Sequence, residues 1–146
     1  MTLDELREAA GRGEIDTVLI GMADMQGRFQ GKRMHVGHFL DTVAEHGAEA
    51  CNYLLAVDVE MNTVGGYALA SWDRGYGDFE LVADLSTLCP IPWHAGTVAV
   101  LCDVKWPDGS PVAPSPRQIL RGQLDRLSER GWMANAGSEL EFIVFE

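Results

Sequence analysis

Short apolar and β-branched runs alternate with segments of helical periodicity along most of this chain. Five runs have the composition of strands, namely residues 15–23, 29–36, 51–57, 79–83 and 97–105. Three segments have the spacing of helices, namely residues 3–10, 39–44 and 117–129. The first two strands flank a turn at residues 24–28, which predicts a hairpin. A hairpin, a helix and further strands in this order predict a small α+β sheet.

The start of the first helix can be predicted from its capping residues. Thr2 is followed three positions later by Glu5, which is the spacing of a capping box. Gly11 and Gly13 then end the helix.

A long stretch between the third and fourth predicted strands has no periodicity. Residues 59–78 are rich in glycine, and long irregular loops inside compact domains are usually functional or mobile. Residues 75–77 read Gly-Tyr-Gly, but the third glycine and the following helix of a dinucleotide fingerprint are missing. A tight turn with a packing tyrosine and a role in a site both remain open for this motif.

Several basic and imidazole side chains are predicted to lie on or beside the hairpin. Arg28, Lys32 and Arg33 form the most basic spot of the chain, and they are interpreted as a solvated strand edge, with a contact to a partner subunit as the alternative. His35 and His38 have a spacing that suits a metal on a helix. A glycine lies between them and no Cys, Asp or Glu completes the set, so a surface pair at a helix start is the preferred interpretation.

The last ten residues have the alternation of a strand that carries two carboxylates. Glu139 and Glu141 are two positions apart, so in a strand they share one face at a distance of about 7 Å. Carboxylates held this close repel one another unless a cation lies beside them, and Mg²⁺ or Mn²⁺ prefers such oxygen ligands. A solvated strand face is the alternative. Residues 142–145 are all apolar, which predicts a strand buried on both faces beyond the carboxylates.

Together with its neighbours, this segment resembles the glutamine synthetase family. The resemblance rests on Pro116-Arg117 at a helix start, the amphipathic helix up to Gly131, and the motif G-x-E-x-E-F-x-x-F over residues 137–145. The resemblance implies that Glu139 binds the divalent ion that carries the nucleotide phosphate. It implies that Glu141 binds the ion nearer to the glutamate substrate.

The resemblance also gives a role to the end of the third predicted strand. Its Asp58 corresponds to the aspartate that reaches the active site of the neighbouring subunit and helps to bind and deprotonate ammonium. In glutamine synthetases proper a Gly-Ser-Ser run follows this aspartate, whereas Val59, Glu60 and Met61 follow it here. Residues 71–78 resemble the branch of the family that joins glutamate to organic amines such as ethanolamine or polyamines. A turn or strand-end cap is the alternative role for Asp58.

The resemblance predicts two parts in this chain. Residues 14–106 are expected to form a β-grasp N-terminal domain, and residues 113–146 the first helix and strand of the catalytic domain. That catalytic domain normally continues for a few hundred residues, so the chain is expected to be a fragment without ligase activity of its own.

Composition narrows the choice of compartment and partners. Lys and Arg number 11 against 22 Asp and Glu, and the net charge of −11 argues against nucleic acid or an anionic membrane as a partner. Three cysteines without a C-x-x-C motif fit reduced thiols in a cytoplasmic protein. No apolar run has the length of a membrane span.

The expected function is ATP-dependent formation of a γ-glutamyl amide from glutamate and an amine, through γ-glutamyl phosphate. The expected acceptor is ethanolamine, a polyamine or ammonium, and the expected assembly is a closed homo-oligomeric ring. The alternatives are an ordinary glutamine synthetase that uses ammonia, and a catalytically inactive interaction or regulatory module of the same fold.

Overall fold

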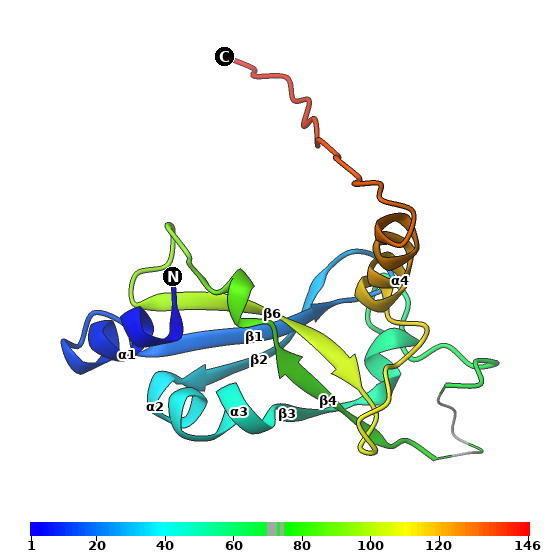
Figure 1. Ribbon diagram of the computed structural model, residues 1–146, viewed down its shortest axis with the longest axis horizontal. Coiled ribbons are helices and arrows are strands. Elements are labelled where there is room, and N and C mark those ends of the chain that lie inside the picture. Colours follow the sequence, from blue (N-terminus) through cyan, green and yellow to red (C-terminus); the bar gives the residue numbers. More distant parts are fainter. Residues whose placement is uncertain (70–72, 74) are drawn as a thin grey trace.

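The computed structural model describes residues 1–69, 73 and 75–146. Its centre is a six-stranded mixed sheet in the order β2-β1-β6-β4-β3, with β5 pairing to β6 (Figure 1). The strands are β1 (Thr17–Ala23), β2 (Phe29–His35), β3 (Ala48–Cys51), β4 (Asp78–Ala83), β5 (Cys89–Pro90) and β6 (Thr97–Lys105). The helices are α1 (Leu3–Gly11), α2 (Val36–His38), the π-helical η1 (Phe39–Val43), α3 (Ala44–His46), the 3₁₀ helices η2 (Asn52–Leu55) and η3 (Leu85–Thr87), and α4 (Pro116–Ser128). The α+β class predicted from the sequence is confirmed.

The predicted hairpin is present and supplies one edge of the sheet. β1 and β2 pair antiparallel, with Thr17 opposite His35 and Ala23 opposite Phe29. Gly27 adopts a φ of 79° in the connecting turn, a left-handed conformation that favours glycine. Lys32 and Arg33 are exposed on β2, as expected for a strand edge.

The core lies on the face of the sheet to which alternate residues of β6 point. Val98, Val100, Cys102 and Val104 are buried there at period two, as strand geometry requires. Side chains of α1 and of the continuous helical segment 36–46 belong to the same buried cluster. The opposite face of β6 carries Asp103, beside which α4 packs.

The first helix begins as its capping residues predict, and the second, expected over residues 39–44, spans residues 36–46. The Thr2 hydroxyl accepts a hydrogen bond from the Glu5 amide at 3.2 Å, and the Glu5 carboxylate accepts one from the Thr2 amide at 2.7 Å. His35 caps the second helical segment, because its Nδ1 accepts from the amide of Gly37 at 3.1 Å. The interpretation of His35 as a helix-start residue is therefore confirmed.

The strand expected over residues 51–57 is wrong. β3 ends at Cys51, and η2 follows directly. Asn52 is buried, its amide donates to Gly77 O at 2.9 Å, and its side chain donates to Leu69 O at 3.3 Å. These bonds turn the chain toward the long loop, and an apolar run alone does not distinguish a strand from such a buried turn. Tyr76 packs edge-to-face on Tyr53, so the packing interpretation of the Gly-Tyr-Gly motif is supported.

Two arginines at the start of α4 attach it to the sheet. Arg117 pairs with Asp84 and, through Nε, with Asp103 at 2.8 Å. Arg121 bridges the same two carboxylates at 3.0 and 2.9 Å. The Ser86 hydroxyl and these arginines hold the pKa of Asp84 below its usual value. Because all four groups are mutually paired, α4 is held at its N-terminal end, while its apolar residues Leu120 and Leu124 remain exposed.

None of the helices in the described ranges has the length and hydropathy that a membrane span requires.

Candidate functional site

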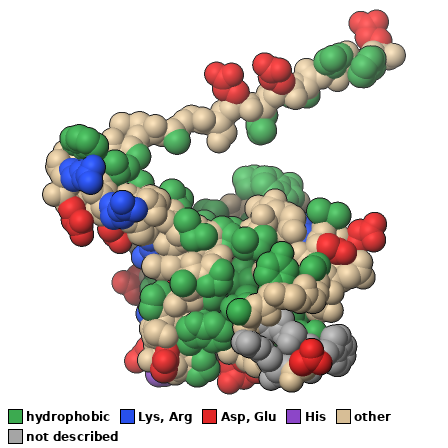
Figure 2. Space-filling view, turned by 90° about the vertical axis from the view of Figure 1, so that its right-hand side faces the viewer, with side chains coloured by type: hydrophobic (Ala, Val, Ile, Leu, Met, Phe, Trp, Pro, Cys, Tyr) green, Lys and Arg blue, Asp and Glu red, His purple; other side chains and the backbone are tan. Residues whose placement is uncertain are grey.

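Glu139 and Glu141 lie in residues 132–146, here termed the C-terminal segment, which forms neither helix nor strand. Figure 1 shows this segment leading away from the body of the molecule, and Figure 2 shows acidic and apolar side chains along it. Leu140 is 90% exposed and Phe142 82% exposed. The expected strand, buried on both faces, is therefore not formed by this chain. A strand must exchange backbone hydrogen bonds with a neighbour, and none of the described strands pairs with this segment.

The chemistry of the two carboxylates fits a hard divalent cation. Mg²⁺ is commonly held by one or two carboxylates and keeps other positions for water and phosphate oxygens. Among the described residues no group of three or more His, Cys, Asp or Glu side chains could hold a metal. A metal ion held by Glu139 and Glu141 would therefore need further ligands from groups outside the described residues of this chain.

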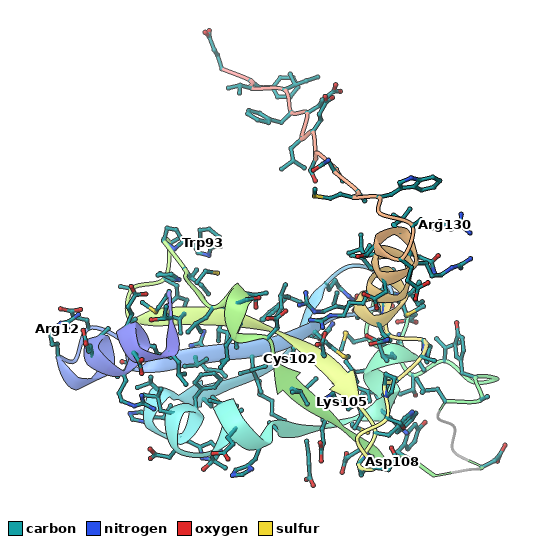
Figure 3. All side chains as sticks on the ribbon, in the orientation of Figure 1. Arg12, Trp93, Cys102, Lys105, Asp108 and Arg130 are labelled. Carbon is teal, nitrogen blue, oxygen red and sulfur yellow. The ribbon has the colours of Figure 1, made fainter. Side chains whose placement is uncertain are left out.

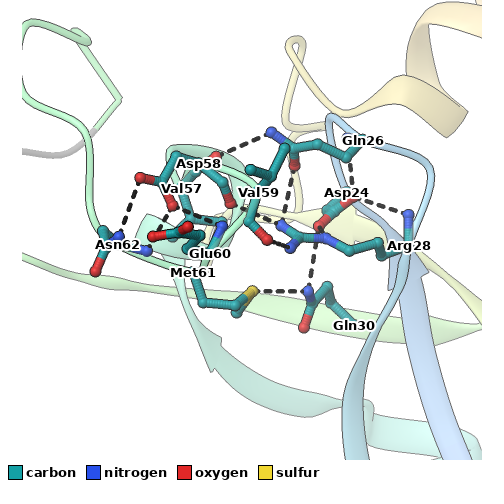
Figure 4. Close-up of polar contacts among 10 residues, drawn as sticks. All are labelled: Asp24, Gln26, Arg28, Gln30, Val57, Asp58, Val59, Glu60, Met61 and Asn62. Atoms are coloured by element: carbon teal, nitrogen blue, oxygen red, sulfur yellow. Dashed lines mark hydrogen bonds and ion pairs between the residues drawn. The ribbon is translucent and has the colours of Figure 1, made fainter.

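Asp58 lies at the start of a compact turn, residues 58–62, here termed the Asp58 turn. Its Oδ1 accepts from the amides of Glu60 and Asn62, both at 2.9 Å, and its Oδ2 accepts from the Asn62 side chain at 3.1 Å (Figure 4). Asn62, through its side chain and then its amide, lowers the pKa of Asp58 below the usual value. The carboxylate is thus ionised at neutral pH and also caps its own turn, which was the alternative role considered for this residue.

Met61 gives the Asp58 turn its tight shape. Its φ is 69°, the one positive value at a residue other than glycine in the described part of the chain. A left-handed conformation costs a non-glycine residue about 1–2 kcal/mol, so the surrounding contacts must compensate for it. One of these contacts is the Gln30 side-chain amide, which donates to the Met61 sulfur at 3.0 Å.

A buried ion pair in the hairpin supports the Asp58 turn. Asp24 is 1% exposed, and its carboxylate accepts from the amides of Gln26 and Arg28, both at 2.9 Å. Arg28 Nε donates to Asp24 Oδ2 at 2.6 Å, while the outer nitrogens of Arg28 donate to Val59 O at 2.7 Å and Asp58 O at 3.0 Å (Figure 4). Burial raises the pKa of Asp24, but the hydrogen bonds outweigh it, so the pKa lies below the usual value.

This network corrects one interpretation and reveals residues that the sequence did not single out. Arg28 was grouped with Lys32 and Arg33 on a solvated edge, yet its side chain is 31% exposed and pairs with a fully buried carboxylate. Asp24 was assigned only to a turn. Asp24 and Arg28 stand at the two ends of a turn that follows a buried strand, and this spacing could have indicated the ion pair.

The three cysteines lie in different environments. Burial raises the pKa of Cys102 to about 12, and Figure 3 places this residue within the sheet. Cys89 is exposed and Cys51 half-buried, and all three thiols are free.

Trp93 projects from the loop between β5 and β6 and is 86% exposed (Figure 3).

Comparison with known proteins identifies the relatives of this chain. No family model matches it. It is 58% identical to the gamma-glutamylethanolamide synthetase GlnA4 of Streptomyces coelicolor, over 98% of this chain and 31% of that protein. It is 36% identical to a glutamate–isopropylamine ligase of a Pseudomonas species, over 96% of this chain and 30% of that protein. Over nearly its whole length, the chain resembles ligases of the glutamine synthetase family.

The fold is also found in a solved structure. A crystal structure of a glutamine synthase homolog superposes with a TM-score of 0.67 at 17% identity, and the match covers 80% of this chain and 27% of that one. The chain spans about a third of the length of the two curated relatives named above. Of residues 71–78, compared above with the amine-ligating branch of the family, 71, 72 and 74 lie outside the described residues.

The structure does not bring the sequence-predicted site residues together within one chain. Asp58 lies in the body of the molecule, on a turn attached to the hairpin. Glu139 and Glu141 lie on the C-terminal segment, which leads away from that body in both views (Figures 1 and 2). A site that uses all three residues therefore needs further protein, either a longer chain or a second subunit.

Proposed function

We propose that this chain is the N-terminal part of an ATP-dependent ligase that joins the γ-carboxylate of glutamate to an organic amine. The observation that carries the proposal is the 58% identity to a gamma-glutamylethanolamide synthetase over 98% of the chain. The second relative is named for isopropylamine, which is also an organic amine. We further propose that residues 14–106 are a β-grasp domain and that residues 113–146 begin the catalytic domain.

In the proposed reaction the γ-carboxylate of glutamate attacks the γ-phosphate of ATP, which gives γ-glutamyl phosphate and ADP. The amine then displaces phosphate. Glu139 and Glu141 would hold the divalent ions, Mg²⁺ or Mn²⁺, Glu139 on the nucleotide side and Glu141 on the glutamate side. When bound, such ions neutralise the charge that shifts during phosphoryl transfer.

Asp58 acts on the amine in this proposal. Its carboxylate is ionised at neutral pH and attracts the protonated amine. It then takes a proton from this amine, which frees the lone pair that attacks γ-glutamyl phosphate. Three of the four residues of the Asp-Gly-Ser-Ser run differ here, and the larger Val59, Glu60 and Met61 change the shape and polarity of the amine entrance. We therefore propose ethanolamine or a similar small amine as the acceptor, in preference to ammonium.

The proposed assembly is a closed homo-oligomeric ring, in which Asp58 of one subunit faces the ions held by the next. The separation of Asp58 from the C-terminal segment supports it, because a second subunit can supply the missing half. Sedimentation of the full-length enzyme, meaning a protein of the relatives' length that contains this sequence, tests the ring. Full activity of a monomer would overturn it.

An amine panel tests the function itself. The full-length enzyme is assayed with ATP, glutamate and Mg²⁺, and kcat/KM is measured for ammonium, methylamine, ethanolamine and a polyamine. The expected result is the highest value with an organic amine, and loss of that activity in Asp58→Ala while ATP and glutamate still bind. A preference for ammonium would make the enzyme an ordinary glutamine synthetase. Absence of turnover with every amine, together with absence of metal-dependent ATP binding, would favour the inactive module.

A further inference from the structure

The Asp58 turn has few contacts of its own that fix its place on the molecule. Val59 is 74% exposed, and Glu60 is also exposed. The hydrogen bonds of the Asp58 carboxylate close the turn on itself and do not connect it to the sheet. The buried residues 55–57 anchor the chain just before the turn, and the exposed turn itself is placed by side chains that reach it from elsewhere.

Those side chains come from the hairpin. Arg28 contacts the carbonyls of Asp58 and Val59 at 3.0 and 2.7 Å, and Gln26 Nε2 donates to Val57 O at 3.1 Å. The Gln26 side-chain oxygen in turn accepts from Arg28 Nη2 at 3.1 Å. Three consecutive carbonyls at the start of the turn are thus held by two neighbouring side chains (Figure 4).

The guanidinium of Arg28 is itself held by a buried carboxylate. Its Nε is held at 2.6 Å by Asp24, whose carboxylate is buried and accepts from four donors. A guanidinium presents its donors in a rigid planar fork, so fixing Nε also fixes the direction of the two outer nitrogens. Arg28 therefore fixes the exposed turn relative to the buried carboxylate of Asp24.

We propose that Arg28 is a positioning residue for the acceptor amine: it sets the place of the Asp58 carboxylate at the amine entrance. This inference rests on the proposed function, and it adds a residue that contacts no substrate. It predicts that weakening the Arg28 fork changes the binding of the amine and leaves the binding of ATP and glutamate unchanged.

Arg28→Lys is the variant that separates positioning from folding. Lysine keeps a positive charge beside buried Asp24, so no carboxylate is left unpaired. Its donors radiate from a single nitrogen, which cannot reach Asp24 and both loop carbonyls together. Arg33→Lys is the matched control, because Arg33 lies on the same hairpin, is exposed, and contacts His94 at 3.2 Å with no recorded bond to the turn. Gln26→Ala is a second variant, which removes one carbonyl contact and no charge.

The experiment has two readouts in the full-length enzyme. Hydrogen exchange measures the protection of the amides of residues 57–63, and steady-state kinetics measures KM separately for amine, ATP and glutamate. In Arg28→Lys we expect exchange of the turn and KM for the best amine each to rise about tenfold, since the two hydrogen bonds from Arg28 to the turn are lost. KM for ATP and glutamate should change less than about twofold. Gln26→Ala should shift the same two quantities by about threefold, and Arg33→Lys should shift neither.

Two results would overturn the proposal while the proposed function stands. One is an Arg28→Lys enzyme with unchanged exchange in the turn. The other is faster exchange with an unchanged KM for the amine, which would show that Arg28 holds the turn without serving the acceptor site. If the wild-type enzyme forms no γ-glutamyl amide from any amine, the proposed function fails and this inference fails with it, whatever the exchange data show.

Discussion

The Asp58 turn and the C-terminal segment carry the two halves of the proposed site, and they differ in how much of their structure this chain provides. Around Asp58 the carboxylates, the guanidinium and three carbonyls have partners within the chain. In the C-terminal segment the apolar side chains lie in solvent and the backbone pairs with no described strand. This chain alone therefore folds the Asp58 turn, which is the acceptor half of the proposed site. The C-terminal segment, which is the metal half, needs further protein to form a strand.

The largest expected contrast concerns one pair of phenylalanines. Phe79 is fully buried in β4, and Phe142 is 82% exposed. In this 146-residue chain, Phe79→Ala should lower the free energy of unfolding by about 3–5 kcal/mol, through lost burial and the cavity it leaves. Phe142→Ala should change it by less than about 0.5 kcal/mol. Urea unfolding measures both, and a large loss in Phe142→Ala would show that the segment packs within this chain.

The next effect belongs to the metal half and is seen in turnover. In the full-length enzyme, Glu139→Ala and Glu141→Ala should each lower kcat by about 100-fold or more, since each removes a proposed metal ligand whose charge would serve the transferring phosphoryl group. Neither change should alter the unfolding midpoint of the 146-residue chain, because both residues are exposed there. Normal kcat at saturating Mg²⁺ in either variant would show that the substituted glutamate is a solvated side chain and not a metal ligand.

The third prediction concerns the helix that leads from one region to the other. Arg117→Ala removes two pairs with half-buried carboxylates and leaves Arg121 to serve both. We expect a loss of about 1–2 kcal/mol in unfolding free energy. Amide exchange should rise at the start of α4 and stay unchanged in the Asp58 turn. Arg126→Ala is the control, because Arg126 contacts only Gln123 among the bonds described for it.

The smallest expected effect is the pH dependence of the acceptor half. The folded-state pKa of Asp24 lies below its unfolded value, so its contribution to stability is present above about pH 4 and is lost as the pH falls through the folded value. Asp24→Asn should be less stable at neutral pH and should lose less additional stability on acidification than the wild type. Unfolding midpoints at neutral and acidic pH measure this, with exposed Asp4→Asn as the control. Equal acid slopes for Asp24→Asn and wild type would contradict it.

Much of the fold could be predicted because its signals are local. The capping box, the hairpin turn and the period-two burial of β6 each depend on residues within a few positions of one another. The missed features depend on partners remote in sequence. η2 replaces the end of a predicted strand because Asn52 bonds to Leu69 and Gly77, which no local pattern reveals.

The residues of the candidate site also divide into those that a local motif indicates and those that depend on remote partners. Asp58, Glu139 and Glu141 could be singled out because their motifs resemble those of a family, but a motif does not state what surrounds it. Arg28 has an ordinary position in the sequence and contacts Asp58 and Val59 some thirty positions away. The alternation at residues 139–145 suits a strand, yet a strand forms only against a neighbour.

The parallel pairing of β1 with β6 has a consequence for the order in which the protein folds. The β1–β2 hairpin closes locally, whereas the register that sets Thr17 beside Thr97 joins distant parts of the chain. On a ribosome the hairpin is complete long before β6 emerges, and until then one edge of β1 has no strand to pair with. Pairings of this range slow folding, and an open edge invites association with other chains. Nascent protein should therefore be most prone to aggregate during synthesis of residues 36–96, and arrival of β6 should end that interval.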